Sequence, residues 1–391
     1  MRLNRLLPGR LTFAGAAFVW LMASLHGQES LPTRLLQADD LVHQGSFTIP
    51  AMRDASGDRL PCEYTQGVIA FNPAHESLFL VCHDWTQTVA EIRIPDLGGE
   101  ATVLQPPTDA LGGRLNQINP SDTNSKKIGG MHVAGDRLLL TAYSFYDGAG
   151  SAVASQFVRS VNLGEDDLQG PWRIGRENPA FYGGYMAPIP PEWQDALGGA
   201  LLVGQCCLSV ISRTSYGPSV SSVNPADLLA ARTRASVTML VGYPDARRAL
   251  APWESTGPLF NGTTIMRGVL LPAHTATVLF FGRHGMGKYC YGEAVDCGDP
   301  ADSGKGTHAY PYEPHVWAYD AHDLAAVRRG RKRPWDLKPY ATWRLPSAVR
   351  QAGIGGVTVD EATGRIFIAE NHGDNVKPRI HVFRVRDVAT P

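Results

Sequence analysis

The chain has 391 residues, with 36 lysines and arginines against 37 aspartates and glutamates, and a formal net charge of −1. This balance offers no basic field for nucleic acid or an anionic membrane surface, so both are excluded as partners. Length alone favours two or three domains, but an internal repeat overrides that expectation.

Residues 1–28 have the pattern of a secretory signal peptide. Arg2, Arg5 and Arg10 form a basic lead, and residues 11–25 are an apolar run without a charge. The run is shorter than the ~20 residues that span a bilayer, and small or polar residues follow it. We therefore expect a secreted or periplasmic protein with no membrane span after signal removal, in which residues 29–391 form a single domain. A retained membrane anchor is the alternative.

From residue 66 onward, one four-strand pattern recurs five times. Each copy has an apolar stretch that usually opens with glycine, a strongly apolar strand, an alternating strand and a short closing strand. The segments are 66–71, 77–82, 88–95 and 101–105; 129–135, 137–143, 156–163 and 171–175; 183–190, 200–205, 218–225 and 235–244; 263–272, 277–283, 315–320 and 340–346; and 353–360, 365–370 and 379–385.

The fifth copy lacks its closing strand, and the N-terminal region supplies a candidate. Residues 41–50 resemble 340–346, since both end in Leu or Ile followed by Pro. Lending this strand to the last repeat would close a ring and remove an exposed sheet edge. The sequence thus predicts an all-β, monomeric protein, a five-bladed β-propeller closed by an N-terminal strand. A sixth blade would need a degenerate repeat within 235–258.

The six cysteines of an exported chain suggest disulfides. Cys62 precedes the first inner strand and Cys82 ends the neighbouring strand, so we expect them to pair at one end of a blade. Cys290 and Cys297 lie in one long loop and are expected to staple it. Cys206 and Cys207 are adjacent, which leaves either a vicinal disulfide or two thiols.

The links between second and third strands are the richest polar segments of the chain. In a propeller blade they emerge on the same face as the links between blades, so we expect one functional face around the central channel. After each apolar second strand comes a hydrogen-bonding side chain: His83, Tyr143, Gln205, Arg283 and Glu370. The same loops and the incoming links add Glu63, Asp84, Trp85, Lys127, Tyr146, Arg213, Tyr216, His284, Tyr289, Asn371 and His372.

These residue types fit carbohydrate chemistry. The candidate catalytic residues are His83, Tyr143, Arg283, Glu370, His284 and His372. An arginine can neutralise a substrate carboxylate while His or Tyr removes the neighbouring proton, as in polysaccharide lyases. Two carboxyl groups roughly 5–10 Å apart would instead make a glycoside hydrolase, and Glu63 and Glu370 would come from neighbouring blades. The other rim residues are expected to bind substrate, aromatic ones by stacking on sugar rings.

A metal site and a nucleophilic serine are the remaining chemistries. Asp296, Asp299 and Asp302 recur at a spacing of three in a Gly-rich loop and could bind Ca²⁺ through oxygen ligands, although the pattern is not an EF-hand. Only His132 lies on an inner strand, whereas iron-binding propellers use several such histidines. No Gly-x-Ser-x-Gly elbow is present. No cofactor other than Ca²⁺ is indicated.

Two segments resemble exported bacterial β-propeller proteins of unassigned function. They are 306–312 followed by 315–320, and 211–218, so the resemblance covers the third and fourth repeats and brings no activity with it. We expect an extracellular propeller that binds, and cleaves, a polysaccharide or oligosaccharide at the channel face. The alternative is a non-catalytic module that recognises a glycan or a protein.

Overall fold

The computed structural model describes residues 30–53, 62–121, 125–206, 214–230, 235–346, 348–350 and 353–387. The chain separates into two units, Met1–Leu31 and Pro32–Pro391, and the second contains every described helix and strand. The predicted signal peptide, residues 1–28, lies outside the described part. Within the described ranges, no helix has the length and apolar character needed to span a membrane.

Five four-stranded antiparallel sheets form the blades of a propeller, as the repeats predict. Blade 1 is β2 (Ile69–Asn72), β3 (Ser77–Val81), β4 (Val89–Arg93) and β5 (Thr102–Thr108), and blade 2 is β6 (Lys126–Ala134), β7 (Arg137–Ser144), β8 (Gln156–Ser160) and β9 (Gln169–Trp172). Blade 3 is β10 (Met186–Pro188), β11 (Leu201–Gly204), β12 (Val220–Val223) and β13 (Thr238–Val241). Blade 4 is β14 (Ile265–Leu270), β15 (Thr277–Gly285), β18 (Tyr312–Asp320) and β19 (Ala341–Arg344). Blade 5 is β20 (Ile354–Asp360), β21 (Arg365–Asp374), β22 (Lys377–Val385) and β1 (Leu41–Thr48).

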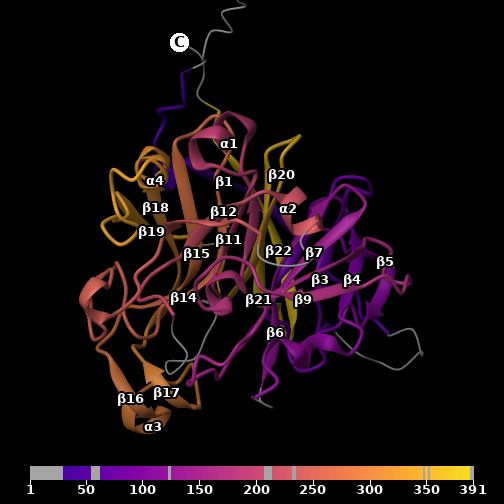
Figure 1. The fold of residues 1–391 in the computed structure, drawn as a ribbon. Coiled ribbons are helices and arrows are strands. Elements are labelled where there is room, and N and C mark those ends of the chain that lie inside the picture. The colour runs from indigo at the N-terminus through magenta and orange to yellow at the C-terminus, as the bar shows by residue number, and fades with distance from the viewer. Residues whose placement is uncertain are drawn as a thin grey trace, which may run out of the picture. The chain divides into compact units, whose positions relative to one another are not determined.

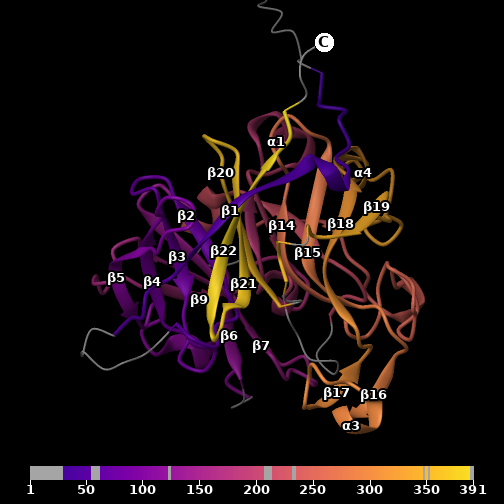
Figure 2. The same ribbon diagram turned by 180° about the vertical axis from the view of Figure 1, so that it is seen from behind.

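The N-terminal strand closes the ring. Strand β1 pairs antiparallel with β22, from Leu41 opposite Val385 to Thr48 opposite Arg379, and Figure 2 shows the indigo strand alongside the yellow one. Phe47 of β1 is fully buried in a cluster with Leu78 and Leu80 of blade 1. The five-bladed prediction is confirmed. The sixth blade is not formed, because the described link between β13 and β14 contains only the short 3₁₀ helix η5 (Ala246–Arg248).

The remaining elements lie just before β1 or in the links between the strands of the blades (Figure 1). They are helices α1 (Pro191–Leu197), α2 (Pro225–Ala230), α3 (Ala294–Cys297) and α4 (Ala321–Arg328), and 3₁₀ helices η1 (Ala38–Asp40), η2 (Arg114–Ile118) and η3 (Pro179–Tyr182). The long link between β15 and β18 carries its own hairpin, β16 (Cys290–Glu293) paired with β17 (Lys305–His308). The sequence had indicated only a loop there.

Glycines allow the inner strands to approach each other around the channel. A Cβ on Gly129 of β6 would lie 2.0 Å from the carbonyl oxygen of Gly183 in blade 3, and a Cβ on Gly355 of β20 would lie 2.6 Å from the Cα of Gly67 in blade 1. No side chain fits at such distances, so these positions require glycine for close backbone packing.

Both predicted disulfides are present, Cys62–Cys82 in blade 1 and Cys290–Cys297 between β16 and α3. Cys206 is also disulfide-bonded, and Cys207 lies outside the described residues. Such cross-links persist in an oxidising compartment. They are consistent with the expected export.

Replacing Cys62 and Cys82 together by serine should lower the free energy of unfolding by about 3 kcal/mol, because the unfolded chain regains the freedom of a span of 20 residues. Urea unfolding of the oxidised proteins measures this cost. The serine pair at Cys290 and Cys297 is the control, since it opens a span of only 7 residues outside the blades. A cost as large at the control pair would contradict the prediction.

Candidate functional site

The channel mouth on the expected face is organised around Arg267, which the sequence analysis had not selected. Arg267 stands at a β-bulge of β14, because Met266 pairs with Gly282 and Gly268 already pairs with Phe281. A bulge of this kind re-aims the side chain of the extra residue. The Arg267 guanidinium donates to the side-chain oxygen of Gln66, and its Nη1 lies 3.8 Å from Cys206 Sγ.

The sequence did contain a signal for Arg267. Where a glycine pair occurs in blades 2, 3 and 5 (129–130, 183–184 and 355–356), blade 4 has Arg267-Gly268 and blade 1 has Gln66-Gly67. Bulges at Gly129 and at the pair 355–356 show that these positions are equivalent. The predicted segment 263–272 contains Arg267, which was therefore counted as part of an ordinary apolar strand.

Tyr143, at the end of β7, lies beside Arg267 as the predicted rim required. It is 3% exposed. Burial raises the pKa of Tyr143 to about 12, with the Arg267 guanidinium opposing the shift and Asp84 adding to it. The hydroxyl is therefore neutral at physiological pH and available as a hydrogen-bond donor.

Asp84 and Lys127 form an ion pair next to Tyr143, on blades 1 and 2. Lys127 binds Asp84 through Oδ2, while Asp84 Oδ1 is buried without a hydrogen-bond partner among the described residues. Asp84 also acts electrostatically on Tyr143 and Arg267. The pair thus places one compensated carboxylate at the edge of the site.

Arg283, the predicted rim residue of blade 4, brings a second guanidinium to this region. Its Cζ lies 4.5 Å from the centroid of the Tyr312 ring, and its Nε is buried with no hydrogen-bond partner in the part of the chain that is described. Burial lowers the pKa of Arg267, Tyr143 and Asp84 oppose that shift, and the positive charge of Arg283 adds to it. Among the described residues, neither guanidinium forms an ion pair with a carboxylate, and the Asp84 carboxylate that acts on Arg267 is already paired with Lys127.

An exposed aromatic cluster borders the mouth at the junction of blades 1 and 5. The Tyr64 ring lies 5.9 Å from His83 and 5.8 Å from His372, and His83 lies 6.1 Å from Trp85. Trp85 is 88% exposed and Tyr64 52%. Tyr64 and His372 have φ of 50° and 60°, a left-handed conformation that costs energy in non-glycine residues and is often found at functional sites.

Two further predicted residues complete this border. The His83 Nδ1 accepts a hydrogen bond from the backbone N–H of Trp85 at 3.1 Å, which leaves Nε2 to face solvent or a ligand. Asn371 is 7% exposed, lies against the backbone of Gly67 and Gly355, and has a buried Oδ1 without a partner among the described residues. Asn371 is therefore placed between blades 1 and 5 at the mouth.

Several predicted residues serve the framework instead. Glu370 is 2% exposed; its carboxylate accepts from the backbone N–H of Arg350 and is bonded to His381 at 2.7 Å. Gln205 is 7% exposed and donates to the backbone oxygen of Ser215. We therefore leave Glu370 and Gln205 out of the site that we propose.

The other predicted contacts are dispersed. Tyr216 and Tyr289 both pack on Trp253, whose indole N–H donates to the Tyr289 hydroxyl. Tyr146 is exposed and edge-on to Phe145, and Glu63 is half-buried with a partner of its own. Arg213 lies outside the described residues.

The three aspartates expected to bind Ca²⁺ do not converge. The Asp299 carboxylate is bonded to His308 at 2.7 Å and to the Tyr312 hydroxyl at 2.6 Å. Asp302 accepts from the backbone of Gly304 in a tight turn. No group of three or more metal-ligating side chains occurs within the described ranges. The aspartates thus hold the hairpin loop together, and we do not propose a calcium site there.

His284 lies inside blade 4, with both ring nitrogens engaged. Nδ1 is 2.8 Å from Thr264 Oγ1 and Nε2 is 3.0 Å from the carbonyl oxygen of Gly257. Burial lowers the pKa of His284 to about 4, and the neighbouring His315 adds to the shift. Its neutral ring is thus a framework hydrogen-bonding group.

The pKa of His284 predicts a loss of stability in mild acid. The unfolded histidine takes up a proton below about pH 6.5, whereas the folded one does so only near pH 4. The contribution of neutral His284 to the free energy of unfolding is therefore complete above pH 6.5 and is lost as the pH falls towards 4. At pH 4.5 the free energy of unfolding should be lower by about 2.5 kcal/mol. Urea unfolding of the wild type and of His284→Gln at pH 7 and 4.5 measures this. An undiminished pH dependence in the variant would contradict the prediction.

No family model and no curated protein matches the sequence. Among solved structures, the chain is similar to one from the GH130 family of mannoside phosphorylases and glycoside hydrolases, with 10% identity, 91% of this chain and 94% of the other covered, and a TM-score of 0.43. For a native arabinanase of Bacillus subtilis, the identity is 9%, 82% of this chain and 93% of the other are covered, and the TM-score is 0.43. For a luciferin-regenerating enzyme, the identity is 7%, 84% of this chain and 93% of the other are covered, and the TM-score is 0.37. At this level, such likenesses carry no inference about activity.

Proposed function

We propose that the protein binds an acidic saccharide at the channel mouth, with a ligand carboxylate held by Arg267 and Arg283. The observation that carries this proposal is the placement of two guanidinium groups at one site, without a carboxylate ion pair to either among the described residues. A partly buried charge is costly unless it is well paired, and the nearby Asp84 is already bound by Lys127, so these two arginines favour an anionic ligand. Arginine also matches the planar geometry of a carboxylate through two parallel hydrogen bonds.

The surroundings support a sugar as the carrier of that carboxylate. Tyr64, His83 and Trp85 expose flat rings beside the arginines. Such rings bury the apolar face of a ligand while leaving its edges to hydrogen-bond donors and acceptors. Asn371 and the Tyr143 hydroxyl supply further polar atoms, Asn371 at the junction of blades 1 and 5 and Tyr143 beside Arg267. An inorganic anion would make no use of this platform.

Cleavage by β-elimination is a second candidate, favoured by the position of Tyr143 next to Arg267. With the carboxylate neutralised by the arginines, a rim imidazole, His372 or His83, would take the proton from the carbon beside it. The electrons would form the carbon–carbon double bond, and the leaving sugar oxygen would depart with the Tyr143 proton. Hydrolysis by Glu63 and Glu370 is less well supported, because the Glu370 carboxylate is already bonded to Arg350 and His381.

Titration of the purified protein with oligogalacturonate, by calorimetry, tests the binding proposal. The matched control is the same oligosaccharide after reduction of its carboxyl groups, which should bind at least a hundredfold more weakly because the charge-assisted contacts with both Arg267 and Arg283 are lost. Binding of the acidic form should also weaken with salt. Equal affinity for the two forms, or no binding of acidic oligosaccharides of any composition, would overturn it.

The same samples separate binding from cleavage. A rise in absorbance near 235 nm reports the double bond of an eliminated uronide, and Tyr143→Phe should abolish that rise while changing affinity little, because a single neutral hydrogen bond is lost. New reducing ends without absorbance would mean hydrolysis. Binding without either signal would leave the protein as a recognition module.

A further inference from the structure

A second cavity opens on the opposite face of the propeller, where first and second strands are joined. It has a volume of about 580 Å³ and is lined by the ends of blades 3, 4 and 5 and by residues that flank β1 and β22. That volume is within the range of small-molecule sites. No part of the proposed channel-mouth site contributes to it.

The lining combines an aliphatic wall with charges of both signs. Pro188, Pro190, Pro191 and Pro272 form the wall with Leu271, Val359 and Ile366, and no Phe, Tyr or Trp is present among the 18 lining residues. The absence of aromatic rings distinguishes this pocket from the channel mouth and does not favour sugar stacking. A ligand with an aliphatic body fits the wall better.

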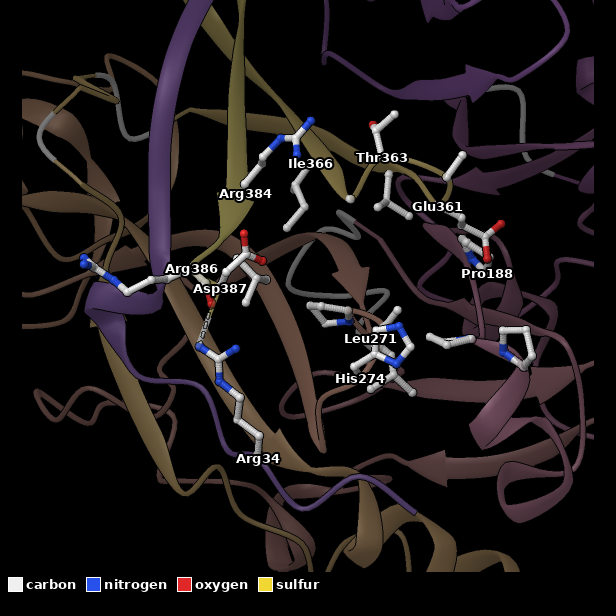
Figure 3. Close-up of a pocket in the computed structure, with 18 residues that line it drawn as sticks. Arg34, Pro188, Leu271, His274, Glu361, Thr363, Ile366, Arg384, Arg386 and Asp387 are labelled. Atoms are coloured by element: carbon white, nitrogen blue, oxygen red, sulfur yellow. Dashed lines mark hydrogen bonds between the residues drawn. The ribbon is translucent and has the colours of Figure 1, made fainter. Parts of the chain in front are cut away.

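Glu361 supplies a negative charge on one side of the pocket, beside Pro188 (Figure 3). It follows Asp360, which is already held by Arg365 and by Thr363. Glu361 is exposed at the surface of the pocket. Desolvation by the surrounding protein raises the pKa of its carboxyl group, and the neighbouring Asp360 raises that pKa further. No hydrogen bond or ion pair to the Glu361 carboxylate occurs among the described residues. A ligand ammonium group would supply the missing partner.

Positive charge lies elsewhere on the lining, on Arg34, Arg384 and Arg386 (Figure 3). Arg34 is paired with Asp40, and Arg386 donates to the backbone oxygen of Asp39. Arg384, in contrast, is exposed and has no hydrogen bond or ion pair within the described part of the chain. Asp387 and His274 also face the pocket. Arg384 is therefore the guanidinium available to a ligand carboxylate.

We propose that this pocket binds a short apolar peptide with free termini, its ammonium at Glu361, its aliphatic side chains on the proline wall and its carboxylate at Arg384. The size agrees, since a sphere of the cavity's volume is about 10 Å across, which is the length of an extended tripeptide. Backbone amides of the peptide remain accessible to solvent at the open side. The site is independent of saccharide binding on the other face.

Calorimetric titration of the whole protein with alanyl-leucyl-alanine tests the proposal. N-acetylation of the peptide should weaken binding roughly tenfold, as should Glu361→Gln, and the two changes together should do no more than either alone, because they remove the same charge-assisted contact. C-terminal amidation and Arg384→Gln should behave in the same way. Glu293→Gln and Arg93→Gln, at exposed positions outside the pocket, are the controls and should leave affinity unchanged.

Ala273→Trp provides a test that does not depend on charge. Ala273 is an exposed lining residue in the turn between β14 and β15, so an indole there should fill the pocket and abolish peptide binding without disturbing the core. Circular dichroism and saccharide titration verify that the variant is folded. Failure of the tripeptide to bind, binding that survives Ala273→Trp, or equal affinity for free and acetylated peptides would overturn the proposal.

Discussion

Arg267→Met should weaken binding of an acidic oligosaccharide roughly hundredfold while leaving the protein as stable as the wild type or more so. The loss corresponds to two charge-assisted hydrogen bonds to a carboxylate. Stability should not fall, because the substitution removes a charge that burial and the nearby Arg283 both disfavour, and methionine fills the space with an apolar chain. Its costs are the hydrogen bonds to Gln66 and Tyr143 and the favourable interaction with Asp84.

Calorimetric titration and urea unfolding of the same preparations measure the two effects. Arg93→Met is the matched control, since Arg93 is exposed at the end of β4, away from the channel mouth, and should change neither quantity. The affinity of Arg267→Lys should lie between those of the wild type and Arg267→Met, because an ammonium group keeps the charge but not the planar pair of donors. Unchanged affinity in Arg267→Met would contradict the role of this residue. Parallel losses of affinity and stability would mean that Arg267 acts only as a structural residue.

The architecture could be predicted because each blade is formed by one contiguous repeat of the sequence. Alternating apolar strands and short links identify blades without knowledge of distant contacts, and the odd strand count of the last repeat requires a partner. The pairing of Leu41 with Val385 follows from that requirement. The β16–β17 hairpin could not be predicted in the same way, because its stability depends on the buried Asp299–His308–Tyr312 cluster rather than on a repeat.

The rim was only partly predictable because strand ends are hard to locate. We expected the second strands to end at Arg283 and Glu370, whereas β15 continues to Gly285 and β21 to Asp374. Side chains alternate along a strand, so His284 points away from the face on which Arg283 lies. Glu370 is held in the framework by His381 and by the backbone N–H of Arg350. For Tyr143 and His83, the strands β7 and β3 end within one or two residues of the predicted positions.

Arg267 shows a different limit. Its position depends on the register between equivalent strands of different blades, and a bulge shifts that register by one residue. Single-sequence alignment of blades cannot detect this when the inner strands share little beyond glycine. Once the bulges of the blades are superimposed, Arg267 is seen to replace a glycine that packs against the neighbouring strand in other blades. Arg267 therefore distinguishes the channel mouth of this protein from a channel closed by glycine packing.

Phe47→Ala should lower the free energy of unfolding by about 3–5 kcal/mol, the usual cost of truncating a fully buried phenylalanine. Phe47 lies on the closing strand and packs with Phe367 of blade 5 and Leu78 of blade 1, so the cavity would form where the two ends of the chain are joined. Phe71→Ala is the control: Phe71 is half-buried and stacked on Phe367 at 5.9 Å, and its loss should cost less in the same urea titration. Tyr64 of blade 1 contacts His372 of blade 5 across this junction, so the affinity of Phe47→Ala for the saccharide should fall as well. A loss of less than about 1 kcal/mol in the free energy of unfolding would mean that the N-terminal strand does not hold the ring closed.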